Sequence, residues 1–507
     1  MSDHSAQQGP AQRAIPPGDS SLAELDRDAQ DLERLGYPQA LRRTMGLFTS
    51  FALAFSMVGI AGGVFSLFSS VFLTVGGIGI WLWLLVLGGI MTIVLVYSHL
   101  AARLPITGYA YQWSSRLVNR HYGWFSGWNA LVSFFIGTAS LAVAIATVFA
   151  PDVWKVPTKA DLVLFATVMI ILAVILNIIG IKLASWVNNV GAYTELVGTV
   201  VVALVLVVGL FFFHHAQGPS ILFQKGAVGG GAITVTAVGL AALLPIFLFL
   251  GWEGSADLAE ETADPRAVAP RAMIRSVLIA GATAILVWVA FAMAIPGSIA
   301  GTVNQPKNPM LYIFQQHFGA AATDLLSVIV FMALFASLIA NVAVATRMCY
   351  SLSRDNMLPG ASLLAKVNAT TRTPIYSTLL VGVIAVLFNF LSGALINKIA
   401  SLVNVTYYLT YLLTMTAVLL ALRSSRIPDA PARYFSLGVW LSPLAVVGLC
   451  WSVIVILDMT IPAVNHSVAA YVIGAELVGL LWYVLVLRSR INQGTAGARL
   501  APVDGRP

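Results

Sequence analysis

Charged side chains are scarce in this sequence. Asp, Glu, Lys and Arg make up 10% of the 507 residues, whereas hydrophobic residues make up 59%. Soluble globular proteins carry about 25% charged residues, so this chain has too few to cover a water-facing surface of its size. Cysteine is nearly absent, since only Cys349 and Cys450 are present and both lie in or beside apolar segments. The composition therefore excludes a soluble globular protein and a disulfide framework.

Motifs of enzymes and metal proteins are missing as well. The sequence contains no Walker sequence, no nucleophile elbow and no cluster of metal ligands. His214 and His215 are adjacent, but a metal site needs more ligands than their segment supplies. We therefore expect no enzyme activity, no cofactor and no bound metal. The net charge of +7 does not predict nucleic-acid binding, because the basic residues lie in short segments between apolar ones.

Long apolar segments recur along most of the chain. A membrane-spanning helix needs about 20 apolar residues. We expect an all-α polytopic membrane protein with twelve such helices, near residues 47–73, 79–101, 124–149, 161–180, 193–213, 233–258, 274–296, 322–346, 375–392, 399–421, 436–457 and 467–487. This twelve-helix domain, residues 37–488, lies between polar tails at 1–36 and 489–507. The first tail contains no early apolar stretch, so we expect no cleavable signal peptide. Its second half, residues 20–35, is compatible with a short amphipathic helix and equally with disorder.

The distribution of basic residues predicts the orientation in the membrane. If the N-terminus lies inside, 23 of the 28 Lys and Arg residues fall in inner segments. The other five fall in outer segments, and these are Lys155, Lys159, Lys225, Lys307 and Lys398. Because inner loops of membrane proteins are enriched in Lys and Arg, we expect both tails to be cytoplasmic. The expected location is the plasma membrane, which is the inner membrane if the protein is bacterial.

Two of the expected spans are interrupted in the middle. The first contains Gly59, Gly62 and Gly63, and the sixth contains Gly251, Glu253 and Gly254, with Pro245 upstream. Glycine can simply allow helices to pack closely. However, interrupted helices in matching positions of two halves are typical of inverted repeats with a binding site at the membrane midplane. We therefore expect two five-helix repeats, residues 47–213 and 233–421, followed by two additional helices at 436–487.

Four segments resemble a known family. They are Ile-Ala-Gly-Gly-Val-Phe at 60–65, Pro-Ile-Thr-Gly-Tyr-Ala-Tyr at 105–111, Gly-Trp-Glu-Gly-Ser-Ala-Asp-Leu-Ala-Glu-Glu-Thr at 251–262, and the segment 347–359 with Arg-Asp-Asn-Met-Leu-Pro at its end. Their sequence and order resemble the amino acid–polyamine–organocation permeases, and most closely the amino acid/choline transporter branch that includes GABA permeases. The chain departs from the family pattern at Ala61, where glycine is usual, and at Glu253, where this branch often has aspartate.

The resemblance implies a substrate site at the two interrupted helices. The amides of Ala61, Gly62 and Gly63 would receive a substrate carboxylate at the positive end of a half-helix, and Ser56 is assigned to the same site. The carbonyl groups around Phe249, Leu250 and Gly251 would accept from a substrate ammonium group, and the aromatic gate residue of the family falls on Phe247. Cavity candidates on helices eight and ten are Ser337, Asn341 and Tyr407, which are equally compatible with interhelical hydrogen bonding.

Two carboxylates inside expected spans call for an explanation, because an ionisable group in a membrane is costly. Glu253 can gate the site, bind the substrate cation, titrate, or simply bond to freed backbone amides. In several relatives the position of Glu195 carries a lysine whose ammonium replaces a bound sodium. Glu195 is therefore a candidate protonation site or cation ligand, unless it lies near the cytoplasmic interface and is solvated.

These features predict a secondary active transporter that moves an amino acid or related amine, such as GABA, by alternating access. Choline, ethanolamine and polyamines are alternative substrates, and exchange is an alternative to symport. Sodium-coupled relatives usually have two adjacent hydroxyls on helix eight, whereas Ser337 is flanked by Ala336 and Leu338. We therefore expect proton coupling rather than sodium coupling. A channel or receptor is the competing class, but no repeated selectivity filter is found in the sequence.

Overall fold

The computed structural model describes residues 27–41, 43–179, 181–212, 216–228, 230–392 and 396–500. Throughout these ranges the regular secondary structure is helical, and β-type pairing is limited to two isolated bridges, Met45 with Thr262 and Ala216 with Pro296. The all-helical fold class is therefore confirmed. Residues 27–34 form a short helix at the end of the N-terminal tail, and residues 20–26 of the expected amphipathic helix lie outside the described ranges.

Ten helical segments are long and apolar enough to cross a membrane. They comprise α2 and α3 (Leu47–Val58, Ile60–Thr74), η1 and α4 (Gly77–Trp81, Leu82–Ala101), α6 (Arg120–Trp154), α7 (Lys159–Ile179), α8 (Ile181–Gly209), α11 (Pro265–Met293), α13 (Pro309–Arg354), α16 (Ile396–Arg423), η4 and α17 (Gly438–Trp440, Leu441–Thr460), and α18 to α19 (His466–Asn492). The other two expected spans coincide with shorter apolar helices, α9 (Val235–Leu248) and α15 (Ile375–Ser392). The structure thus supports a polytopic membrane protein, with ten of the expected spans meeting the length criterion.

Short helices connect these segments. They are α5 (Tyr109–Leu117), η2 (Pro219–Phe223), α10 (Gly254–Asp257), η3 (Ala259–Glu261), α12 (Ile299–Val303) and α14 (Ala361–Leu364). The long helix α13 also changes direction at Gly319, whose φ of 80° is not helical. The part of α13 after this turn corresponds to the eighth expected span.

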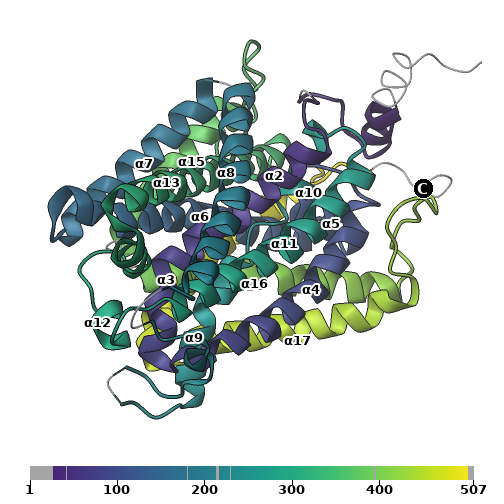
Figure 1. Ribbon diagram of the computed structural model, residues 1–507. Coiled ribbons are helices and arrows are strands. Elements are labelled where there is room, and N and C mark those ends of the chain that lie inside the picture. The colour runs from purple at the N-terminus through teal and green to yellow at the C-terminus, as the bar shows by residue number, and fades with distance from the viewer. Residues whose placement is uncertain are drawn as a thin grey trace, which may run out of the picture.

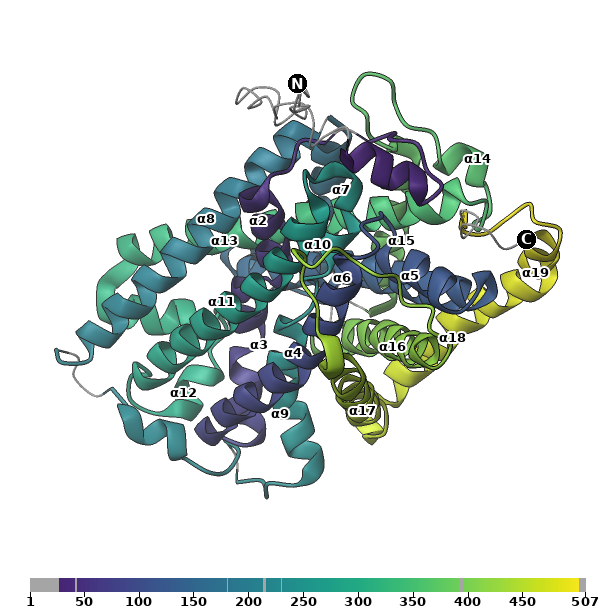
Figure 2. The same ribbon diagram turned by 90° about the vertical axis from the view of Figure 1, so that its right-hand side faces the viewer.

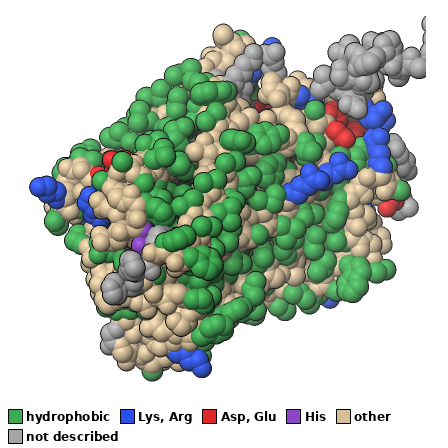
Figure 3. Space-filling model, viewed as in Figure 1, with side chains coloured by type: hydrophobic (Ala, Val, Ile, Leu, Met, Phe, Trp, Pro, Cys, Tyr) green, Lys and Arg blue, Asp and Glu red, His purple; other side chains and the backbone are tan. Residues whose placement is uncertain are grey.

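The interrupted helices lie in the interior of the bundle. Helix α2 packs against α8, α11 and α13, and it is seen among them in Figure 1. Most residues of the first span and of α6 are buried, whereas few residues of α17 and α18 are. Figure 3 shows that hydrophobic side chains cover most of the middle of one outer face, as expected for a surface in contact with lipid hydrocarbon.

Both expected interruptions are present, and they touch. Helix α2 ends at Val58, Gly59 adopts a left-handed conformation (φ 60°, ψ 66°), and α3 begins at Ile60. The second break follows α9 and includes Gly251, whose φ is 90°. Only glycine adopts such backbone angles without strain. A Cβ atom on Gly251 would lie 2.9 Å from the Cβ of Met57, so close contact of the two breaks also requires glycine here.

Residues near the two ends of the described chain meet at one end of the bundle. The Tyr37 hydroxyl accepts a 3.0 Å hydrogen bond from the backbone amide of Arg499, and the amide of Gly497 donates to the Asp355 carbonyl at 2.9 Å. Figure 2 shows the C-terminal segment after α19 running beside α5 at this end. We call this the terminal end of the bundle.

Candidate functional site

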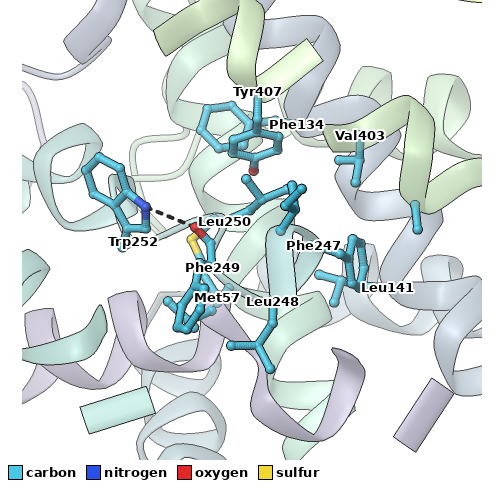
Figure 4. Close-up of a cluster of buried hydrophobic side chains, with 14 of the residues drawn as sticks. Met57, Phe134, Leu141, Phe247, Leu248, Phe249, Leu250, Trp252, Val403 and Tyr407 are labelled. Atoms are coloured by element: carbon cyan, nitrogen blue, oxygen red, sulfur yellow. Dashed lines mark hydrogen bonds between the residues drawn. The ribbon is translucent and has the colours of Figure 1, made fainter. Parts of the chain in front are cut away.

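A small cavity lies where the two helix breaks meet. Its volume is about 30 Å³, which is room for only one or two water molecules. Four residues expected at a site line it, namely Phe247, Leu250, Asn341 and Tyr407. The remaining lining residues were not expected, and they are Met57, Val58, Gly59, Gly137, Leu141 and Val403. Figure 4 shows side chains of α2, α6, α9 and α16 converging on this region.

The cavity is mainly apolar, with polar groups on one side. Asn341 of α13 accepts a 2.9 Å hydrogen bond through Oδ1 from the Thr138 hydroxyl of α6. The ring of Tyr407 meets that of Phe134 edge to face at 5.7 Å (Figure 4). In its present volume the cavity cannot hold an amino acid, so binding of such a solute requires that the surrounding helices move apart.

Glu195 is fully buried and contacts the first break. It lies on α8, and its Oε1 accepts a 2.9 Å hydrogen bond from the backbone amide of Ala61 in the first turn of α3. Its Oε2 has no hydrogen-bond partner among the described residues. The carboxylate therefore sits at the positive N-terminal end of a helix, where a negative charge is stabilised. The alternative that Glu195 is solvated at an interface is wrong.

Glu253 is fully buried at the second break. Its Oε2 accepts a 3.2 Å hydrogen bond from the Tyr411 hydroxyl of α16, and its Oε1 has no partner among the described residues. The ring of Tyr411 stacks on Trp252 with centroids 5.5 Å apart and meets Tyr97 of α4 edge to face at 5.6 Å. The centroid of the Tyr407 ring lies 6.2 Å from that of Tyr411. We call Tyr97, Trp252, Tyr407 and Tyr411 the aromatic cluster.

Only Tyr407 of this cluster was among the expected site residues. Tyr411 follows Tyr407 by one helical turn and so lies on the same face of α16, a signal that the sequence does offer. Tyr97 comes from α4, far away in the sequence, and no local pattern links it to Glu253.

The other expected residues are mostly engaged in packing or local hydrogen bonds. The Phe249 carbonyl accepts a 3.2 Å hydrogen bond from Trp252 Nε1, which is drawn in Figure 4. Added Cβ atoms on Gly62 and Gly63 would lie 3.2 Å from Leu334 and Leu248, so these glycines serve close packing of α3. The Ser337 hydroxyl donates to the Ala333 carbonyl at 3.0 Å, while that of Ser56 is buried without a partner among the described residues.

The other family-like segments come together at the terminal end. Arg347 Nε lies 2.7 Å from Glu261 Oε1, and Arg354 Nη1 lies 3.0 Å from Glu260 Oε2. The Gly108 amide donates to Asp257 Oδ1 at 2.7 Å. These contacts join α5, the segment after the second break, and the end of α13, and we call them the ion-pair network. The network therefore ties these three segments together at the terminal end.

The N-terminal segment adds hydrogen bonds at the same end of the bundle. Tyr37 and Tyr111 donate to Asp355 Oδ2 at 2.6 and 2.8 Å. Burial, with the neighbouring Asp355 charge, raises the pKa of Tyr37 to about 12. Its hydroxyl therefore stays protonated at neutral pH and remains a hydrogen-bond donor.

A larger hollow lies on the opposite side of the cavity. Its volume is about 600 Å³, and it is lined by α3, α9, α16 and the start of α18, including Leu243, Lys398 and Ser401. Leu243 precedes Phe247 by one turn of α9, and Ser401 precedes the cavity residue Val403 on α16. Only about one helical turn of packed side chains therefore separates the hollow from the cavity.

Comparisons with known proteins agree with this architecture. The sequence model of the family described as amino acid permease matches residues 45–484. The chain is 25% identical over 476 residues to the branched-chain amino acid permease BcaP of Bacillus subtilis, covering 90% of this chain and 96% of the relative. It is 24% identical over 492 residues to amino-acid permease BAT1 of Arabidopsis thaliana, covering 90% and 92%.

A further relative is named for a different substrate. The low-affinity putrescine importer PlaP of Escherichia coli is 26% identical over 314 residues, covering 60% of this chain and 66% of the relative. These relatives are permeases and an importer, not enzymes. Because the family match spans most of the sequence, the chain belongs to the amino acid permease family.

Proposed function

We propose that this protein is a secondary active transporter that carries an amino acid or a related amine across the plasma membrane by alternating access with proton symport. One observation carries the proposal: two fully buried carboxylates, Glu195 and Glu253, lie at two helix breaks that touch each other. Buried ionisable groups in membrane spans mark substrate and ion pathways. The relatives include amino acid permeases and a putrescine importer, which supports both substrate classes, with GABA as a further candidate.

Alternating access follows from the placement of the breaks and the closures. Gly59 and Gly251 are hinges between half-helices, and inverted repeats at 47–213 and 233–421 would place them in equivalent positions. The ion-pair network closes the terminal end, and side chains such as Phe247 and Leu141 separate the cavity from the opposite hollow. Opening one closure while the other holds would expose the site to each side in turn. With both tails cytoplasmic, the network is the inner closure.

Proton coupling rests on Glu195. Its carboxylate is fully buried, one oxygen lacks a partner among the described residues, and the other binds the break in the first span. Loading and unloading a proton there would change the charge at the end of α3. Because that end contacts the hinge at Gly59, protonation would be coupled to helix movement.

Uptake into proteoliposomes tests this function. The purified full-length protein is supplied with radiolabelled amino acids, GABA, putrescine and choline under imposed gradients of protons or sodium. We expect concentrative uptake of at least one amino acid or amine with an inward proton gradient. Flux that only follows the solute gradient would indicate a channel, and strict one-for-one exchange would indicate an exchanger.

A further inference from the structure

The N-terminal end of α3 already holds a carboxylate of the protein. Ala61 N donates to Glu195 Oε1 at 2.9 Å, and the amide of Gly63 donates to the Gly59 carbonyl at 3.1 Å. Two of the three amides expected to receive a substrate carboxylate therefore have acceptors within the chain. A substrate carboxylate that used Ala61 would have to displace Glu195.

Displacing Glu195 is unfavourable in either protonation state. The residue lies within α8 and is fully buried, so moving its side chain away from Ala61 requires that neighbouring side chains shift. An ionised Glu195 repels a second carboxylate brought next to it, and this repulsion is strong in a poorly hydrated site. A protonated Glu195 still accepts from Ala61 N through its carbonyl oxygen.

The second break offers the opposite chemistry. Glu253 Oε1 is buried and has no hydrogen-bond partner among the described residues, so it can accept from a charged donor. The other rings of the aromatic cluster contact Tyr411, whose hydroxyl donates to the second oxygen of the same carboxylate. Ring faces attract cations, and a carboxylate with an ammonium group forms a strong charge-assisted hydrogen bond.

We propose that the site selects amines that lack an α-carboxylate over the corresponding amino acids, because Glu195 occupies the place where the carboxylate of an amino acid would bind. The proposal rests on the transport function proposed above. In this arrangement Glu253 and the aromatic cluster bind the ammonium group. Glu195 acts as a specificity residue that stands in for the missing carboxylate.

Matched pairs of solutes test the proposal directly. Ornithine and putrescine, lysine and cadaverine, and arginine and agmatine each differ by one α-carboxylate. Competition in a counterflow exchange assay measures the affinity of the reconstituted full-length protein without need of a proton gradient. We expect each amine to compete at least about tenfold better than its amino acid, as for the loss of one charge-assisted hydrogen bond.

Two substitutions at one position separate occupancy from folding. Glu195→Gln keeps an oxygen that accepts from Ala61 N, so the preference for amines should persist. Glu195→Ala removes the carboxylate that accepts from Ala61 N, so the affinity for each amino acid should rise about tenfold relative to that for its amine. Glu33→Gln is the matched control, because this carboxylate is exposed on the short helix at residues 27–34, and it should leave the ratio unchanged. Size-exclusion elution reports whether each variant is folded.

The outcomes distinguish the two proposals. Preference of the wild type for the amino acid of each pair, or for neutral amino acids over all the amines, would overturn the amine proposal while the transport function stands. An unchanged ratio in folded Glu195→Ala would also overturn it. Failure of the wild type to exchange or accumulate any amine or amino acid would overturn the transport function itself.

Discussion

Replacement of Glu195 by glutamine isolates the role of its proton. Glutamine has nearly the same shape and keeps an oxygen at the position that accepts from Ala61 N at 2.9 Å. It cannot titrate. The hydrogen bond changes from charge-assisted to neutral, which costs about 1 kcal/mol. We therefore expect the variant to fold and to bind substrate with an affinity within about tenfold of the wild type.

The loss should be in accumulation. A transporter that moves one proton with each substrate gains about 1.4 kcal/mol for each pH unit of gradient, which corresponds to tenfold accumulation. In proteoliposomes with an inward proton gradient of about one pH unit, the wild type should concentrate its substrate up to about tenfold. Glu195→Gln should equilibrate or exchange the substrate without concentrating it.

Two results would refute this reasoning. A Glu195→Gln protein that still concentrates substrate on a proton gradient would show that another group carries the proton. Strict sodium dependence of the wild type would assign Glu195 to holding a cation. Glu33→Gln serves as the control here too, and it should accumulate substrate like the wild type.

Three further predictions concern the other parts of the molecule. Glu253→Gln should raise the Kd of the purified protein for its substrate by about tenfold or more, because a charge-assisted hydrogen bond worth about 1.5–3 kcal/mol is lost. Unchanged affinity would exclude Glu253 from substrate binding. Gly62→Leu should abolish uptake while expression stays normal. A Cβ atom at position 62 would already lie 3.2 Å from the Leu334 side chain, so the rest of a leucine side chain has no room there. Gly62→Ala should retain uptake. Lys225→Cys, in a background with Cys450→Ser, should react with an impermeant thiol reagent in intact cells; labelling only after permeabilisation would contradict cytoplasmic termini.

The sequence predicts the helix breaks because glycine and buried charge are local signals. Glycine in the first span and the Gly251–Gly254 segment of the sixth each correspond to a break in the structure. The first break falls at Gly59, however, and Gly62 and Gly63 continue within α3. Glycine permits both a left-handed residue and close packing of helices. The choice between these roles is made by neighbours such as Leu334 and Met57, which local sequence does not reveal.

The partners of the two carboxylates could not be predicted from the sequence. Ala61 and Glu195 are 134 positions apart, and Tyr411 and Glu253 are 158 positions apart. Their contacts exist only because the helices pack as they do. Phe249 differs, because its carbonyl was expected to face substrate but accepts at 3.2 Å from Trp252, a neighbour only three positions along the chain. Residue types thus indicated where charge had to be accommodated, while tertiary packing determined what accommodates it.

The expected span lengths differ from the structure for a related reason. The sixth span was expected to run from 233 to 258 because its apolar composition continues past the break. In the structure α9 ends at Leu248, since Phe249 and Gly251 leave the helical conformation. Hydropathy reports on the surroundings of a segment and is the same for a continuous helix and a broken one. It therefore gives the span without its interruption.

In the proposed cycle the ion-pair network is a closure that must open, and its energetics suit that role. Arg347 and Glu261 are almost completely buried, and so are Arg354 and Glu260. Burial of such pairs costs desolvation energy that largely offsets their attraction, so the closed state gains little net stability from them. When the end opens, both partners regain water together. Removing only one partner is different, because it leaves a buried charge alone at a cost of about 3–5 kcal/mol.

The network is also directly connected to the second break. Helix α10 has only four residues, Gly254–Asp257, and η3 follows with Glu260 and Glu261. So short a helix cannot bend independently of its ends, and any rotation about Gly251 must move both glutamates relative to α13. In the proposed cycle, a cation bound at Glu253 would lie two residues from Gly251 and within one short helix of the ion pairs. The proposed site and the proposed closure at the terminal end would therefore move together.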